Sequence, residues 1–257
     1  MNVRICSKRH SGFRATLLLA LAALLLFMPV PAYAHAPQGA GETPEVTLEP
    51  IQIYDGEGTL LSISIDDLAA IEGNLCICIA TSFRVISTAI DNLYEDGEIP
   101  VRGELSAVYR HPGAGHKNAF NYVFTEAYAT YEKTGNPQKL ALENWSYTFT
   151  RRDTGDVFET QVLEGVIADG FCDLRYKVNG FKKGWHENRP DEEEQAAFVA
   201  AWTETRDNFL TLPAWELYSS VEEPEEPAPV GAIVFSGALI LLIAIGFVYS
   251  ARGKRNR

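Results

Sequence analysis

The chain has 257 residues, of which 46% are hydrophobic and 22% charged, and its formal net charge at pH 7 is −12. These proportions exclude a wholly disordered chain and leave room for one sizeable core, while the acidic excess argues against nucleic acid as a partner. All 34 acidic residues lie between the two apolar segments near the ends of the chain. Such a surface favours cations or basic partners, and it is equally typical of a surface that only keeps a domain soluble.

The first 34 residues have the three parts of a secretory signal peptide. Basic residues between Arg4 and Arg14 precede an apolar stretch at 15–30, and the small-residue sequence Ala-Tyr-Ala follows at 32–34. We expect cleavage after Ala34. Residues 35–45 are rich in proline and glycine and predict a flexible lead.

The C-terminal region predicts a membrane anchor. Residues 230–251 are uncharged and long enough to span a bilayer, and the basic tail at 252–257 follows directly. An acidic, proline-rich stalk at 221–229 precedes the span. We therefore expect a single-pass protein of the cell membrane with its domain on the extracytoplasmic side and its tail in the cytoplasm. A C-terminal sorting signal that is processed after export is the alternative.

The segment between these regions, residues 46–220, predicts a single α+β domain. Alternating apolar residues on both sides of Asp55 and Gly56 indicate a β-hairpin. Ser64 can cap a short helix at 65–71. After Cys78, apolar residues recur at the spacing of one helix face, which predicts a helix through the centre of the domain: Ile79, Phe83, Ile86, Ile90 and Leu93.

The second half of the domain predicts one more strand, then a helix, then strands. Residues 101–110 form the strand, and the helix that follows has Phe120, Val123, Phe124, Ala127 and Tyr131 on one face and ends at 136–137. The patterns predict paired strands at 142–152 and 155–165, a further strand or edge at 171–180, and a helix at 191–208. This order predicts helices packed on a mixed β-sheet.

Three cysteines remain outside the signal peptide: Cys76, Cys78 and Cys172. Three interpretations stay open. Thiolates could hold zinc or another soft transition metal, with His111, His116 or His186 as further ligands. Alternatively, Cys172 forms a disulfide with one of the other two, or all three are buried thiols without a special role.

The turn at 111–118, HPGAGHKN, has two interpretations. Free backbone amides at a helix N-terminus, together with Lys117, could bind an anion, or the turn simply starts a helix. No Ser/His/Asp arrangement can be recognised by spacing, and no HExxH or GxSxG motif is present in the sequence. We therefore expect an accessory or binding protein more than a catalyst.

Residues 72–84, EGNLCICIATSFR, resemble the signature that opens the formylmethanofuran dehydrogenase E-like family. Glu72 and Asn74 stand where that family has histidines, and other positions carry the family residue: Gly73, Leu75, Cys76 and Arg84. Asn118-Ala119 is similar to a later Asp-Ala of the family, and the resemblance covers about residues 62–220.

The resemblance implies a helix–strand–helix–three-strand α+β fold with a cysteine-centred metal site. It also implies an accessory role beside a redox enzyme that contains molybdenum or tungsten. The metal-ligand candidates are then Cys76, Cys78, His111, His116 and Cys172. The ligand-binding candidates are Asn74, Arg84, Lys117 and Asn118. A degenerate, metal-free domain that binds a small ligand or a protein is the alternative function.

Overall fold

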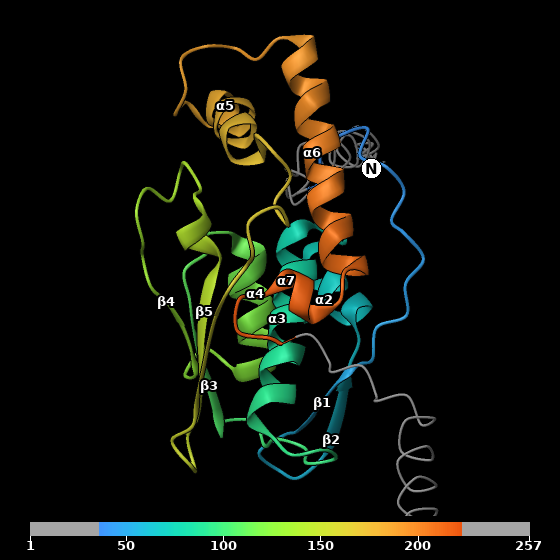
Figure 1. Ribbon diagram of the computed structural model, residues 1–257, viewed down its shortest axis with the longest axis vertical. Helices are drawn as coiled ribbons and strands as arrows, with labels where there is room; N and C mark the ends of the chain where they lie inside the picture. The colour runs from blue at the N-terminus through green and yellow to red at the C-terminus, as the bar shows by residue number, and fades with distance from the viewer. Residues whose placement is uncertain (1–35, 223–257) are drawn as a thin grey trace, which may run out of the picture. The chain divides into compact units, whose positions relative to one another are not determined.

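The computed structural model of the chain describes residues 36–222, which form an α+β domain (Figure 1). The predicted signal peptide, transmembrane helix and tail lie outside these residues. No helix within 36–222 combines the length and apolar character that a membrane span requires. The elements, in chain order, are β1 (Ile51–Tyr54), β2 (Leu60–Ile63), α2 (Ile65–Glu72), α3 (Ile77–Leu93), β3 (Leu105–Tyr109), α4 (Ala114–Phe124), β4 (Ala129–Tyr131), the 3-10 helix η1 (Leu142–Trp145), β5 (Ser146–Arg151), β6 (Val157–Gln161), α5 (Phe171–Lys183), α6 (Glu192–Thr211) and α7 (Ala214–Leu217).

The first elements form as local sequence predicts. Strands β1 and β2 pair antiparallel. Ser64 caps α2 in a reciprocal arrangement with Asp67, which satisfies backbone amides that the helix itself leaves without partners. Gly73 then ends α2 with a φ of 75°, a conformation that glycine adopts at little cost.

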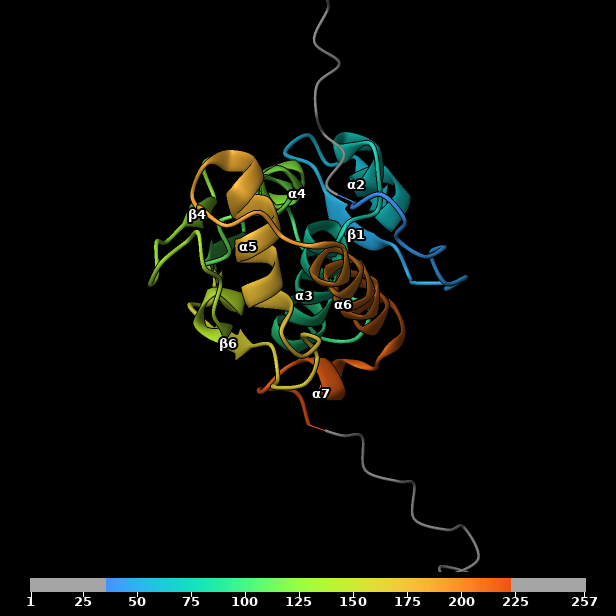
Figure 2. The same cartoon turned by 90° about the horizontal axis from the view of Figure 1, so that it is seen from above.

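Helix α3 is the centre of the domain, as its apolar spacing predicts. It packs against α2, α4, α6 and strands of both sheets, and in Figure 2 it lies inside the ring of surrounding helices. Ile79, Phe83 and Ile86 are almost completely buried. Thr81 and Thr88 are buried as well, because α3 has neighbours on several sides; each hydroxyl donates to the carbonyl four residues earlier.

The main sheet has four strands in the order β4-β3-β5-β6 and is mixed, because β3 and β4 are parallel while the other pairs are antiparallel. Alternate residues of β3, β5 and β6 are buried on the face that α3 and α4 cover, as a sheet with one covered face requires, whereas the short edge strand β4 has no buried residue. Ala107, Phe149 and Phe158 are neighbours across three strands of that face. The α+β class and the mixed sheet agree with the prediction.

The helix predicted to continue to residue 136 ends earlier, and this expectation is wrong. Helix α4 stops at Thr125, whose φ of 68° is incompatible with a helix. Ala129 and Tyr131 instead belong to β4, which pairs with β3. Tyr131 keeps an aromatic contact, with Tyr109 at 5.8 Å between ring centroids. Backbone pairing along the sheet edge outweighs the helical spacing.

The strand or edge expected at 171–180 is also wrong, since these residues form helix α5. Phe171, Leu174 and Val178 follow one another at steps of three and four, which is helical spacing. The helix packs on α6, where the rings of Phe171 and Phe198 stack 6.1 Å apart. The apolar residues at helical spacing therefore form the face of α5 that packs on α6.

Helix α6 begins at the predicted place, where Asp191 and Glu194 form a capping box. The lead at 36–45 has no helix or strand, yet it is attached to this helix. The buried guanidinium of Arg206 donates to the carbonyls of Gly41 and Glu42.

Candidate metal centre

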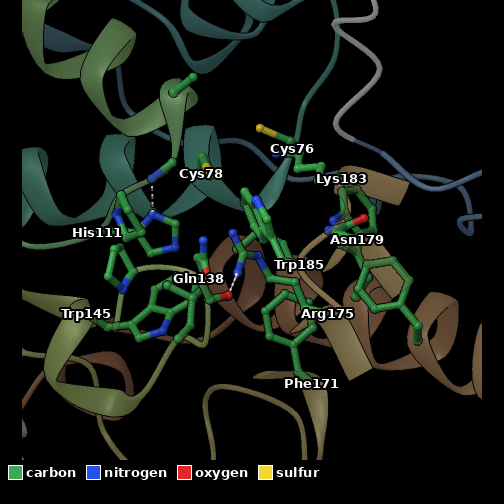
Figure 3. Close-up of a pocket in the computed structure, with 18 residues that line it drawn as sticks. Cys76, Cys78, His111, Gln138, Trp145, Phe171, Arg175, Asn179, Lys183 and Trp185 are labelled. Carbon is green, nitrogen blue, oxygen red and sulfur yellow. Dashed lines mark hydrogen bonds between the residues drawn. The ribbon is translucent and has the colours of Figure 1, made fainter. Parts of the chain in front are cut away.

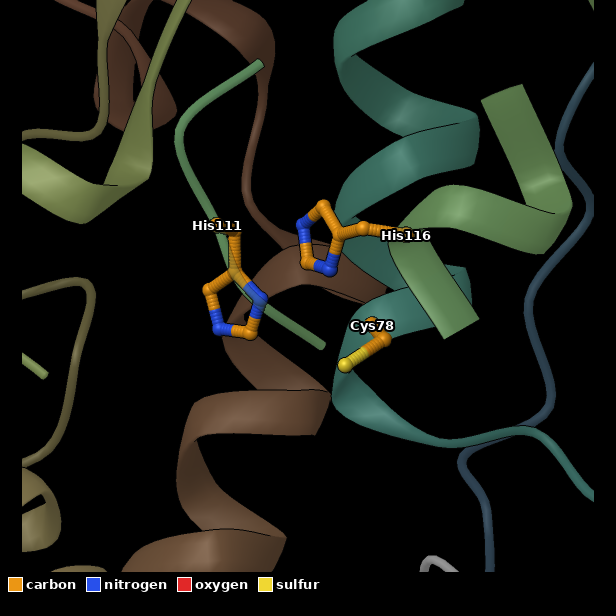
Figure 4. Close-up of side chains that lie close together, drawn as sticks. All are labelled: Cys78, His111 and His116. Carbon is orange, nitrogen blue, oxygen red and sulfur yellow. The ribbon is translucent and has the colours of Figure 1, made fainter. Parts of the chain in front are cut away.

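Three side chains that could hold a metal ion meet at the N-terminal ends of α3 and α4 (Figure 4). Cys78 is the second residue of α3, His111 follows β3, and His116 lies in the first turn of α4. One ligand atom of each lies within 4.8 Å of the others. Both imidazoles are almost fully buried, and their rings stack with centroids 4.0 Å apart.

Two glycines allow α4 to approach Cys78 this closely. A Cβ on Gly113 would lie 2.7 Å from Cys78 Sγ and 2.9 Å from His111 Nδ1, and a Cβ on Gly115 would lie 2.8 Å from Cys78 Cβ. Cβ atoms in proteins essentially never lie under 3.0 Å from an atom that is not bonded to them. The glycines of the turn therefore serve the packing of the cluster.

Hydrogen bonds orient the two rings differently. His116 Nε2 lies 3.0 Å from the hydroxyl of Tyr147, and its Nδ1 has no hydrogen-bond partner among residues 36–222. With the proton on Nε2, that nitrogen donates to Tyr147 and Nδ1 presents a lone pair, which is how groups outside the ligand shell prepare a histidine ligand.

His111 is hydrogen-bonded through Nδ1, whereas His116 is hydrogen-bonded through Nε2. Its Nδ1 accepts a hydrogen bond of 3.0 Å from the N–H of Gly113, and its Nε2 has no partner in the described domain. The neutral ring therefore carries its proton on Nε2. To bind a metal through Nε2, the neutral ring must carry its proton on Nδ1 instead. Nδ1 can then no longer accept the hydrogen bond from Gly113.

Burial keeps both imidazoles neutral, the state in which histidine binds metals. It lowers the pKa of His116 from 6.5 to about 3. Burial is also the main cause that lowers the pKa of His111 well below its usual value, and the charges of His116 and Arg175 add to it. A neutral imidazole keeps a lone pair even in mildly acidic solution.

The two cysteines of α3 have opposite electrostatic surroundings. Cys76 is the N-cap residue, and its pKa is lowered by a hydrogen bond from the Cys78 thiol and by backbone amides of the first turn. The pKa of Cys78 is raised by this same interaction and by burial. A metal cation beside Cys78 would lower the pKa of its thiol again, because the thiolate is the form that binds metals.

The donor set fits a soft ion. Tetrahedral zinc with bonds of about 2.0–2.3 Å spaces its ligands about 3.3–3.8 Å apart, so the three side chains need to close by about 1 Å. Two imidazole nitrogens without hydrogen-bond partners in the described chain, together with one thiol, satisfy the chemistry of such a site.

Comparison with known proteins adds no assignment. No family model, no curated protein and no solved structure matches this chain. The site is therefore interpreted from its own geometry.

The structure brings together three of the five expected metal ligands. Cys76 lies beside the cluster, while Cys172 lies in the first turn of α5 and does not belong to it. All three cysteines of the described residues are free thiols, so the disulfide interpretation is wrong for this structure. His186 is engaged elsewhere, with Asn188 and the ring of Tyr176.

The expected ligand-binding residues occupy different surroundings. Arg84 donates to the carbonyl of Leu212, far along the chain, with a distance of 2.7 Å. Asn118 donates to the carboxylate of Glu72, so these two residues connect α4 with α2. Asn74 donates to the backbone carbonyl of Glu72. The side chain of Lys117 is exposed and lies 3.9 Å from Glu126.

Sequence reasoning missed the groups around the cluster. Trp145 packs edge-on against His111 with ring centroids 4.4 Å apart, and Tyr147 contacts His116. Beside the cluster lies a cavity of about 410 Å³, whose wall includes Cys76, Cys78 and His111 (Figure 3). The tryptophan, placed just before a strand, carries no signal that could have identified it.

Proposed function

We propose that this domain binds a soft transition metal ion, zinc in the first place, through Cys78, His111 and His116. The observation that carries the proposal is the convergence of three ligand atoms within 4.8 Å from segments far apart in the sequence. Two of these atoms can be imidazole nitrogens with no hydrogen-bond partner in the described domain. A buried polar atom without a partner is costly, and a metal ion would remove that cost.

Three protein ligands leave one coordination position for a ligand or a partner's side chain. Because Cys78 and His111 also line the cavity, we expect the fourth coordination position of the metal to face the cavity. A bound zinc ion would polarise a group that enters from the cavity; copper(I) or iron would give the redox-accessory form of the same site. Structural zinc sites usually have four protein ligands, whereas a site with three protein ligands keeps one position for an exchangeable ligand.

The wider role follows from the sequence. The resemblance to the formylmethanofuran dehydrogenase E-like family favours an accessory metal-binding domain beside a redox enzyme. The terminal segments favour an exported domain anchored in the cell membrane. Protease added to intact cells should then reach the domain, and protection until the cells are opened would contradict this topology.

Metal content tests the central proposal. The full-length chain, purified without chelator, should carry about one zinc ion per chain by elemental analysis. Cobalt(II) added to the chelated protein should give the thiolate charge-transfer absorption of a Cys-ligated site. Cys78→Ser should abolish that absorption, while Cys172→Ser is the matched control and should leave it unchanged.

The partner of His116 offers a second test. Tyr147→Phe removes the hydroxyl that orients the imidazole and should weaken metal binding about 10–100-fold, as loss of a group that orients a ligand does. Metal-free protein whose melting temperature does not respond to zinc or chelator would refute the proposal. The alternative, a metal-free ligand-binding domain, would then stand on the cavity alone.

A further inference from the structure

The cavity beside the cluster has a charge opposite to that of the domain. The chain has 34 acidic and 22 basic residues, yet no aspartate or glutamate of the described residues lines this cavity. Its charged members are Arg175 and Lys183, which lie eight residues apart on α5, and Asn179 lies between them (Figure 3). Steps of four residues place these side chains along one face of the helix.

Arg175 has no carboxylate partner among residues 36–222, although carboxylates are near it along the chain. Its Nη1 donates to the backbone carbonyl of Gln138 at 3.1 Å. Asp173, two residues earlier, pairs with Lys139 at 2.9 Å, and Lys177 pairs with Glu194. The other charged residues of this part of α5 are thus paired, and Arg175 is left facing the cavity.

A half-buried guanidinium without a carboxylate is costly for the fold. Arginine presents five N–H donors in a planar fork that matches a carboxylate, and the bond to Gln138 uses a single nitrogen. The arrangement therefore leaves most of the fork available to a ligand. Lys183 lies over the ring of Trp185 at 4.9 Å and adds positive charge on the same side.

The rest of the wall is aromatic. Five large rings surround the space and come from η1, the start of α5, the segment after α5, and α6: Trp145, Phe171, Trp185, Phe198 and Trp202. A volume of about 410 Å³ is within the usual range for small-molecule sites. Flat apolar groups are the natural occupants of such a wall.

We propose that this cavity binds a small organic anion, with its carboxylate on the guanidinium of Arg175 and its flat apolar body among the aromatic rings. The proposal goes beyond metal binding and does not depend on it. The ligand would lie beside the Cys78 and His111 wall, where a metal ion would be its neighbour.

Intrinsic fluorescence provides the assay, because three of the four tryptophans of the chain line the cavity. The full-length chain is titrated with phenylacetate and with its neutral analogue phenylacetamide, at pH 7, with and without chelator. We expect phenylacetate to bind about tenfold more tightly or better, since hydrogen bonds to charged groups are the stronger ones. The preference should persist in chelated, metal-free protein.

Two variants identify the group responsible. Arg175→Gln should remove the preference for the acid, and Arg175→Lys should keep part of it, because the charge remains and the fork is lost. Arg110→Gln is the matched control: Arg110 pairs with Glu132 and does not line the cavity, so the preference should be unchanged.

Equal affinity for acid and amide, or no fluorescence response to either, overturns the proposal. So does an unchanged preference in Arg175→Gln. The wild-type comparison requires no variant, so poor folding of Arg175→Gln cannot rescue a failed prediction. Acid binding in a protein that takes up no metal would refute the proposed metal centre and leave the anion site standing.

Discussion

Replacing Gly113 by alanine tests how tightly the cluster is packed. The backbone at this residue has φ −70° and ψ 136°, which alanine adopts without strain. In the unfolded chain alanine is less flexible than glycine, an effect that alone would stabilise the protein by about 0.4–1 kcal/mol. Any loss of stability in Gly113→Ala must therefore come from contacts of the added methyl group.

Those contacts are severe. The new Cβ would lie 2.7 Å from Cys78 Sγ and 2.9 Å from the His111 ring. The thiol can turn away, but the ring is confined between His116 and Trp145, at 4.0 and 4.4 Å between centroids. Overpacking of this kind costs about 1–3 kcal/mol, so we expect a net loss of about 1–2 kcal/mol after the backbone gain.

Urea unfolding of chelated protein, followed by circular dichroism, measures this loss. Gly56→Ala is the control, since its added Cβ meets no atom within 4 Å and its φ lies outside the left-handed region. The control should be neutral or slightly more stable. Because the alanine displaces two of the three ligands, Gly113→Ala should also bind cobalt(II) more weakly. Wild-type stability together with wild-type metal affinity would refute the packing argument.

Three further predictions concern pH, the core and the lead. In chelated protein the unfolded state takes up a proton at His116 below pH 6.5 and the folded state does so only near pH 3, so His116 alone should lower stability between these values by about 1.4 kcal/mol per pH unit. His111, whose pKa is also lowered by burial, should add to this loss, and equal urea midpoints at pH 7 and pH 5 would contradict the prediction. Phe83→Ala should cost about 3–5 kcal/mol in the same assay, whereas Phe181→Ala, at an exposed ring, should cost much less. Arg206→Met removes the bonds to Gly41 and should make the lead sensitive to limited proteolysis, and unchanged digestion would show that other contacts hold it.

Local sequence was sufficient where an element carries its own signals. The serine cap of α2 and the apolar stripe of α3 involve residues only a few positions apart, so they can be recognised without knowing the fold. The two errors have a different origin. Ala127 and Tyr131 continue a helical spacing, but the free edge of β3 pairs with residues 129–131, and that edge exists only in the folded sheet.

For the candidate site, the sequence determined which residues could act and the tertiary structure decided which of them meet. Thiols and histidines are recognisable as soft-metal ligands by their chemistry alone, and Cys78, His111 and His116 were among the candidates for that reason. Their convergence depends on how α4 docks onto α3, which two glycines permit through contacts that no spacing rule describes. Arg175 could not be identified from the sequence for the same reason. A guanidinium becomes a binding group only when the fold places it at a cavity without a carboxylate partner, and both conditions depend on side chains far away in the sequence.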